Sequence, residues 1–84
     1  MNRETAIVIF RAPKKGINVD LEVPLYISAN DLVIGLNNAY DLGIDTSDVK
    51  NCYLKAERPI ALLRGDKTLR EYGVRNGTLI SFNE

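Results

Sequence analysis

The stretch TLREYGVRNGTLISF, residues 68–82, decides the fold of this chain. Leu69, Tyr72 and Val74 recur at spacings that place them on one side of a tight coil. Residues 79–82 then alternate between two faces, as the residues of a strand do. The stretch therefore predicts a short helical turn, a bend and a terminal strand.

Two glycines mark chain reversals inside this stretch. Gly73 and Gly77 can take positive φ at no steric cost, and Asn76-Gly77 is the strongest short turn signal in the sequence. A Thr-Leu-x-x-Tyr-Gly-Val-x-x-Gly-Thr run before a terminal strand resembles the C-terminal third of ubiquitin-like β-grasp domains. The resemblance implies that Tyr72 lies over the preceding loop with its ring buried and its hydroxyl bonded to backbone, and that Gly73 is left-handed. The alternative for Tyr72 is a half-buried ring on a surface turn.

The length and composition predict one soluble domain spanning residues 1–84. A chain of 84 residues holds a single small core, and 45% apolar and 26% charged residues are ordinary for a globular fold. No apolar run approaches the roughly 18 residues of a membrane helix, so we expect no insertion into a membrane. The opening MNRETAIVIF lacks the cleavage site of a signal peptide. The single cysteine fits a reducing compartment.

Charge and residue content argue against several classes of function. Eleven basic and eleven acidic residues cancel, which removes the positive field that nonspecific nucleic-acid binding requires. There is no histidine, and Cys52 beside Tyr53 and Leu54 is expected to be a core residue without a partner base. The glycines form no phosphate-binding loop. We therefore expect no enzyme activity, no cofactor and no metal site, which leaves a binding module.

Two strands open the chain. Residues 5–12, TAIVIFRA, are β-branched and apolar, and Pro13 ends them. Residues 18–23 alternate without a fault, so one face of this second strand is buried and the other is wet. The buried face of the second strand consists of Val19, Leu21 and Val23. The first strand is ambiguous, because both of its faces are apolar.

One helix is predicted after the second strand. Ser28 is placed to cap it with Asp31 three residues later, so the helix should begin at Ala29. Gly43 is placed to end it. Its inward stripe at helical spacing is Ala29, Leu32, Leu36 and Ala39. Ile34 lies well away from that stripe, so either the helix is buried widely or Ile34 is available to a partner.

Two short strands precede the closing stretch. Residues 51–56 turn Cys52 and Leu54 inward and Tyr53 outward, and residues 60–64 return after a Glu-Arg-Pro turn. The order of elements predicts an α+β fold in which one main helix packs across one face of a mixed sheet of four to five strands.

The chain resembles ubiquitin over nearly its whole length, and more narrowly it is similar to the YukD/EsaB family of small ubiquitin-like proteins. The narrower match lies in the run VDLEVP at residues 19–24 through Tyr26 into a helix rich in Leu and Asn, and in YGVRNG at residues 72–77. That family implies a cytoplasmic accessory or regulator of a Gram-positive type VII (ESX/WXG100) secretion system. It implies a protein partner, with a membrane-bound component of the machine as one candidate, and it is compatible with weak self-association.

The C-terminal residues bear on conjugation. Ubiquitin and the related sulfur carriers act through a flexible tail ending in Gly-Gly, because activation needs an extended, unhindered carboxylate. This sequence ends Ser81-Phe82-Asn83-Glu84, with Phe82 still in the expected strand. We therefore expect neither conjugation nor sulfur transfer. An interaction domain cut from a larger scaffold or signalling protein remains the alternative function, and the initial Met1 with the short acidic end favours a complete small protein instead.

The candidate interaction residues lie on the sheet face away from the helix. In the register that the resemblance implies, Ile7 and Ile9 point under the helix and the residues between and after them point away. An apolar area on that outer face is of the kind that soluble proteins bury against a partner, although single exposed side chains are the alternative. The resulting set is Val8, Phe10, Tyr53, Leu79 and, on the helix, Ile34.

Overall fold

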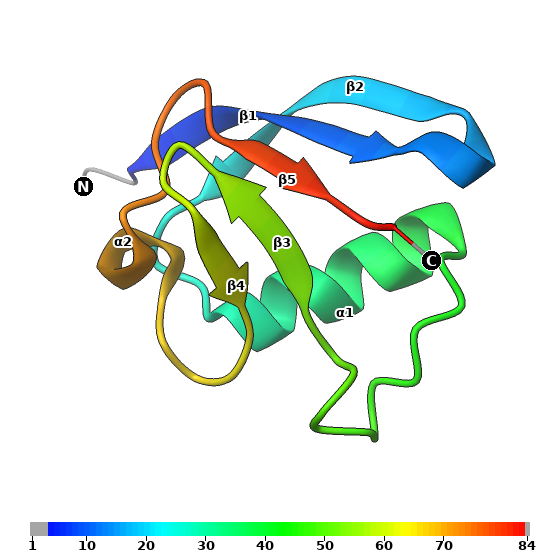
Figure 1. Cartoon of the computed structure of the whole chain (residues 1–84). Coiled ribbons are helices and arrows are strands. Elements are labelled where there is room, and N and C mark those ends of the chain that lie inside the picture. The colour runs from blue at the N-terminus through cyan, green and yellow to red at the C-terminus, as the bar shows by residue number, and fades with distance from the viewer. Residues whose placement is uncertain (1–3, 84) are drawn as a thin grey trace.

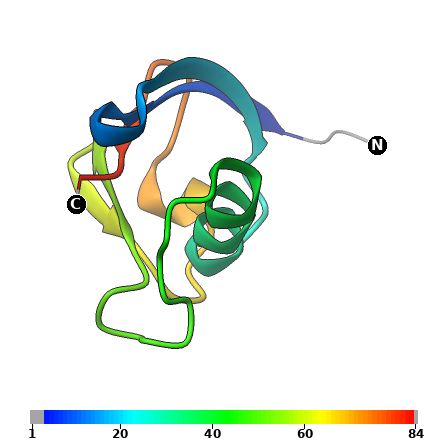
Figure 2. The ribbon, with the colours of Figure 1, turned by 90° about the vertical axis from the view of Figure 1, so that its right-hand side faces the viewer.

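Five strands form one mixed sheet in the order β2-β1-β5-β3-β4, and helix α1 crosses one face of it (Figures 1 and 2). This computed structural model describes residues 4–83. β1 and β5 run parallel, and the other paired strands are antiparallel. The elements are β1 (Thr5–Ala12), the 3₁₀ turn η1 (Pro13–Lys15), β2 (Ile17–Pro24), α1 (Ala29–Tyr40), β3 (Leu54–Glu57), β4 (Ala61–Leu63), α2 (Leu69–Tyr72) and β5 (Leu79–Ser81). The α+β fold expected from the sequence is confirmed.

The faces of β1 are the reverse of those that the sequence predicted. Val8 pairs with Leu21 and Phe10 pairs with Val19, and directly opposed residues point to the same face of a sheet. Val8 and Phe10 therefore share the helix-covered face with the inward side of β2, and their exposed fractions are 1% and 0%. The expectation that these two residues face outward is wrong.

Ile7 and Ile9 take the opposite face. Ile7 is 46% exposed and Ile9 is half-buried, so neither lies under the helix as expected. The physical reason is the nature of the other side chains on each face of β1. The inward face of β1 also carries Ala6 and Ala12, which are small and apolar. If Ile7 and Ile9 pointed inward instead, Arg11 would be buried with them, and burying its charge is costly.

Helix α1 begins as predicted and ends earlier. The Ser28 hydroxyl accepts the N–H of Asp31 at 3.0 Å, as an N-cap does. The helix ends at Tyr40, and Asp41 takes the left-handed conformation at φ 54°, two residues before Gly43. This early end lets Leu42 drop into the core, where it is 1% exposed. The inward residues are Ala29, Leu32, Val33 and Leu36, while Ala39 is exposed, which corrects the predicted stripe.

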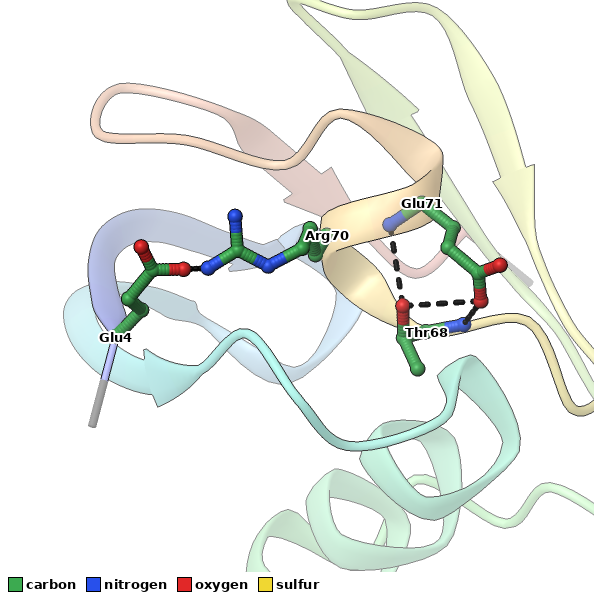
Figure 3. A network of polar contacts seen from close by, with 4 residues as sticks. All are labelled: Glu4, Thr68, Arg70 and Glu71. Atoms are coloured by element: carbon green, nitrogen blue, oxygen red, sulfur yellow. Dashed lines mark hydrogen bonds and ion pairs between the residues drawn. The ribbon is translucent and has the colours of Figure 1, made fainter. Parts of the chain in front are cut away.

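The closing stretch has the predicted form. The Thr68 hydroxyl accepts the N–H of Glu71 at 3.1 Å, and the Glu71 carboxylate accepts the N–H of Thr68 at 2.9 Å, so a full capping box opens α2 (Figure 3). Gly73 is left-handed at φ 84°. The Tyr72 hydroxyl donates to the carbonyl of Arg64 at 2.7 Å, which confirms the expected bond to backbone. The Tyr72 ring is half-buried, so the expectation of a buried ring is wrong.

An ion pair joins the start of β1 to α2. The Arg70 guanidinium contacts the Glu4 carboxylate, and Figure 3 shows these two side chains reaching toward each other from the two elements. Both side chains are more than half exposed, so the pair contributes little to stability. The pair lies where α2 approaches the beginning of β1.

The segment between α1 and β3 contains polar turns. The Asp48 carbonyl accepts N–H groups of Asn51 and Cys52, so the chain is still turning where the sequence predicted a strand. β3 therefore begins at Leu54 instead of residue 51. Cys52 is buried, as expected, and its thiol donates to the Asn30 side chain at 3.4 Å. Burial raises the pKa of the Cys52 thiol, with a further contribution from nearby carboxylates, so the thiol stays protonated.

Candidate functional site

The face of the sheet opposite α1, here called the open face, is built by strand register. Ile9 of β1 pairs with Leu79 of β5, and Leu79 pairs with Glu57 of β3, so these three side chains lie in one row. Lys55 pairs with Ser81 on one side and with Leu62 of β4 on the other. The strand residues of this face are Thr5, Ile7, Ile9, Arg11, Asn18, Asp20, Glu22, Pro24, Lys55, Glu57, Leu62, Leu79 and Ser81. Ile60, in the turn before β4, is counted with them because it lines the same groove as Leu62.

Apolar side chains are exposed at both ends of this face. Ile7 is 46% exposed and Leu62 is 45% exposed, and Ile60, in the turn before β4, is 90% exposed. Leu79 is only 8% exposed because β5 is the central strand and neighbours flank it on both sides. The open face therefore has a filled centre and two accessible apolar ends. Helix α1 lies on the other side of the sheet (Figure 2).

The charges on the open face are arranged in rows. Pairing places Asp20, Ile9, Leu79 and Glu57 across four strands, so an apolar centre has an acidic residue at each end. The neighbouring row is Asn18, Arg11, Ser81, Lys55 and Leu62, with two basic side chains. A surface complementary to this face would combine an apolar strip with basic groups opposite Asp20 and Glu57 and acidic groups opposite Arg11 and Lys55.

Two adjoining grooves widen the surface. A groove of about 450 Å³ that includes open-face residues is lined by Lys55, Ala56, Glu57, Ile60, Ala61, Leu62, Ser81 and Asn83. A second groove of about 350 Å³ contains Tyr53 together with Asp45, Asp48 and Phe82. Both grooves share Lys55, Ser81 and Asn83, so Tyr53 lies next to the open face.

The acidic end of the second groove is fixed locally. The Asp45 carboxylate accepts the Ser47 hydroxyl at 2.6 Å and the Ser47 N–H at 3.0 Å. These hydrogen bonds lower the pKa of Asp45, because they favour the ionised form. The carboxylate therefore stays charged at neutral pH.

The structure brings together only part of the predicted interaction set. Tyr53 is half-buried and Leu79 lies on the open face by register, whereas Val8 and Phe10 are in the core and cannot touch a partner. Ile34 is half-buried on α1, in the other layer of the fold, so it is not part of the same surface. The sequence prediction missed four residues of this surface: Ile7, Ile9, Ile60 and Leu62.

One sequence signal identifies the missed face of β1. Thr5 and Arg11 share the parity of Ile7 and Ile9, and a strand that turned the isoleucines inward would bury a threonine hydroxyl and a guanidinium with them. The other parity contains only apolar residues. Ile60 and Leu62 have no comparable signal, because a three-residue strand is too short for its alternation to be read.

Neither a metal site nor a membrane span is found among residues 4–83. No cluster of three or more His, Cys, Asp and Glu side chains in this range is arranged around a common point. No helix in the described range has the length and apolarity to cross a membrane.

The register, the helix across one face and the closing Tyr72-Gly73 turn define a ubiquitin-like β-grasp protein. The family model described as "WXG100 protein secretion system (Wss), protein YukD" matches residues 5–81. The chain belongs to this YukD family. Comparison with curated protein sequences gives no match.

Solved structures with the same fold are ubiquitin-like domains of other proteins. One is the C-terminal ubiquitin-like domain of mouse tubulin-specific chaperone e, with TM-score 0.74, 14% identity, and 99% of this chain and 89% of that chain covered. A second, from tubulin-binding cofactor B, has TM-score 0.76, 19% identity and coverages of 99% and 92%. The ubiquitin-like domain of Plasmodium falciparum Dsk2 has TM-score 0.62, 18% identity and coverages of 93% and 97%. At these identities the likeness concerns the fold.

Proposed function

We propose that this protein is a cytoplasmic, non-conjugating ubiquitin-like binding module of a WXG100 (type VII) secretion system, and that it docks a protein component of that system on its open face. The observation that carries the proposal is the family match over residues 5–81. The exposed apolar ends of the open face, Ile7 and Leu62, support the mode of action.

Binding through a preformed surface is supported by the state of the last strand. The Phe82 N–H donates to the carbonyl of Arg11 at 2.9 Å, so the chain stays attached to β1 up to Phe82. Conjugating enzymes need a free, extended segment after the last strand, whereas the described residues up to Phe82 are hydrogen-bonded to the sheet. A partner that contacts side chains of several strands can bind the open face without a free terminal segment.

The partner's chemistry follows from the open face. A membrane-bound component of the secretion machine is a suitable candidate if its cytoplasmic part offers an apolar strip beside acidic side chains. Such a strip would cover the accessible apolar ends and pair with Arg11 and Lys55. These pairs set orientation and association rate more than affinity.

Site-specific photo-crosslinking in cells tests the proposal. A photoreactive phenylalanine analogue at Leu62 should give an adduct with one component encoded by the secretion system, identified by mass spectrometry. The same analogue at Asn38, an exposed residue of α1 in the other layer, is the matched control and should give none.

A functional arm accompanies the crosslink. Cells carrying the double variant Ile7→Ser with Leu62→Ser should secrete less WXG100 substrate while the variant accumulates to the wild-type level. Normal secretion by that strain, or an adduct formed only with proteins outside the system, would overturn the proposal. The second result would favour an interaction domain of another pathway.

A further inference from the structure

The free edge of β2 is the longest unpaired backbone in the sheet. β2 and β4 are the two edge strands. β4 has three residues, whereas β2 has eight and pairs with β1 along its full length without a bulge. Natural proteins usually shorten, bend or cover such an edge, because it is a template for another strand. The edge of β2 is neither short nor interrupted by a bulge.

Hydrogen bonds around β1 show which backbone groups of β2 are free. The Ile9 N–H donates to Thr78, and the carbonyls of Ile7 and Arg11 accept from Gly77 and Phe82, all at 2.9 Å. The odd residues of β1 therefore bond toward β5. Since the N–H and C=O of one residue point the same way and successive residues alternate, the even residues of β1 bond toward β2.

The same alternation assigns the groups of β2. The even residues of β1 are opposite Val19, Leu21 and Val23, so these three bond inward. The bond from the Leu25 N–H to the Glu4 carbonyl, at 3.0 Å, continues the same pattern beyond the strand. Asn18, Asp20 and Glu22 consequently direct their N–H and C=O groups away from the sheet, at the free edge.

The side chains beside this edge have two different characters. The residues with free backbone groups are Asn18, Asp20 and Glu22. Their side chains lie on the open face, and all three are exposed. On the helix side, Val19 and Leu21 are half-buried although their partners Phe10 and Val8 are fully buried. Helix α1 therefore stops short of covering the β2 edge, and an apolar margin remains there.

From these observations we propose that the β2 edge binds an extended segment of a partner protein that alternates basic and apolar residues and adds to the sheet as a sixth strand. Its Lys or Arg side chains lie opposite Asp20 and Glu22 on the open face. Its apolar side chains point to the helix side and pack against Val19 and Leu21. This mode of recognition draws affinity from backbone bonds and specificity from alternate side chains.

A second copy of this chain is a poor occupant of the same edge. Antiparallel pairing of β2 with itself, centred on residue 20, places Asp20 opposite Asp20. Centring it on residue 21 places Asp20 opposite Glu22. Like charges directly opposite each other destabilise a strand pair. The acidic edge therefore selects a basic strand and disfavours self-pairing.

The binding test uses synthetic peptides and NMR. An eight-residue peptide that alternates Lys and Val, acetylated and amidated, is titrated into ¹⁵N-labelled protein. Amide shifts should concentrate at Asn18, Asp20 and Glu22. The same peptide N-methylated at every second residue keeps its charge but cannot complete the ladder, and an alternating Glu and Val peptide carries the wrong charge. Both controls should bind at least about tenfold more weakly.

Two variants separate the backbone from the charge. Asp20→Pro and Asp20→Asn both remove the carboxylate, but only proline removes the outward N–H, and an edge strand tolerates proline at such a position. Asp20→Pro should lose more peptide affinity than Asp20→Asn, while both keep the wild-type fold. The double charge reversal Asp20→Lys with Glu22→Lys should bind the Glu and Val peptide more tightly than the Lys and Val peptide.

Three outcomes overturn the inference. They are equal binding of the Lys and Val peptide and its N-methylated form, shifts located at Ile7 and Leu62 instead of β2, and concentration-dependent dimerisation through β2 seen by sedimentation. The inference goes beyond the proposed function and fails separately from it. Ile7→Ser with Leu62→Ser should abolish the open-face docking and leave peptide binding at the β2 edge intact, so the two are tested separately.

Discussion

The two faces of β1 have similar sequences and opposite environments. Ala6, Val8, Phe10 and Ala12 face α1 and are at most 3% exposed, whereas Thr5, Ile7, Ile9 and Arg11 face away. Each face carries two large apolar residues, so hydrophobicity alone does not choose between them. The choice depends on what each face must pack against.

The two faces of β1 differ in the side chains of this chain that surround them. Phe10 packs against Tyr40 of α1 with ring centroids 5.3 Å apart, and it is opposite Val19 in the adjacent strand. Ile7 is opposite Glu22, whose carboxylate accepts the hydroxyl of Thr5, so its surroundings are polar. One face is therefore committed to stability, while the other is available to a partner.

The largest effect is expected in the buried face. Phe10→Ser removes a fully buried ring and places a hydroxyl in the core, and it should cost at least about 3 kcal/mol of unfolding free energy. Chemical denaturation followed by circular dichroism measures this cost. A loss below about 1 kcal/mol would show that the two faces have been exchanged.

A smaller loss of unfolding free energy is expected at the turn between α2 and β5. Gly73 is left-handed, and its N–H donates to carbonyls of Arg70 and Leu69. Gly73→Val forces a β-branched residue into positive φ, which should cost about 2 kcal/mol. Gly73→Asn is the matched control, since Asn tolerates this conformation better, and it should lose clearly less. Equal melting temperatures for the two variants would contradict the assigned turn.

On the open face, substitution should affect binding rather than stability. Ile7→Ser and Leu62→Ser each alter a side chain that is nearly half exposed, so each should change the unfolding free energy by less than about 1 kcal/mol. Comparison of Ile7→Ser with Phe10→Ser on the same strand measures the contrast directly. Similar destabilisation by both would mean that the open face is packed.

The smallest expected effect depends on pH and lies at α2. The Thr68 N–H, and then the Thr68 hydroxyl, lower the pKa of Glu71 below its ordinary value of 4.5. A carboxyl group with a lowered folded-state pKa contributes stability above its ordinary pKa and loses it as pH falls through the lowered value. Melting temperature should therefore fall less between pH 5 and pH 3 for Glu71→Gln than for wild type. Identical slopes would show that the capping box is not formed in solution.

The sequence predicted the elements better than their faces. Capping residues, the Tyr72-Gly73 turn and the alternation of β2 are local signals, and each was found where it was expected. The end of α1 and the start of β3 were misplaced by a few residues, because Leu42 enters the core and Asp48 organises a turn. Of the predicted interaction residues, Tyr53 and Leu79 lie at the open face and Val8 and Phe10 do not.

By itself, the sequence determined the order of the strands and the helix, the turns between them and the resemblance to ubiquitin-like proteins, because caps, glycines and alternation act over a few residues. Only the tertiary structure decided which side of β1 meets the helix and which strand keeps a free edge. These properties follow from pairing between residues far apart in the chain, such as Phe10 with Val19 and Ile9 with Leu79. A shift of that pairing by one residue would exchange the two faces, and the only local signal against it is the polar pair Thr5 and Arg11 on the outward face.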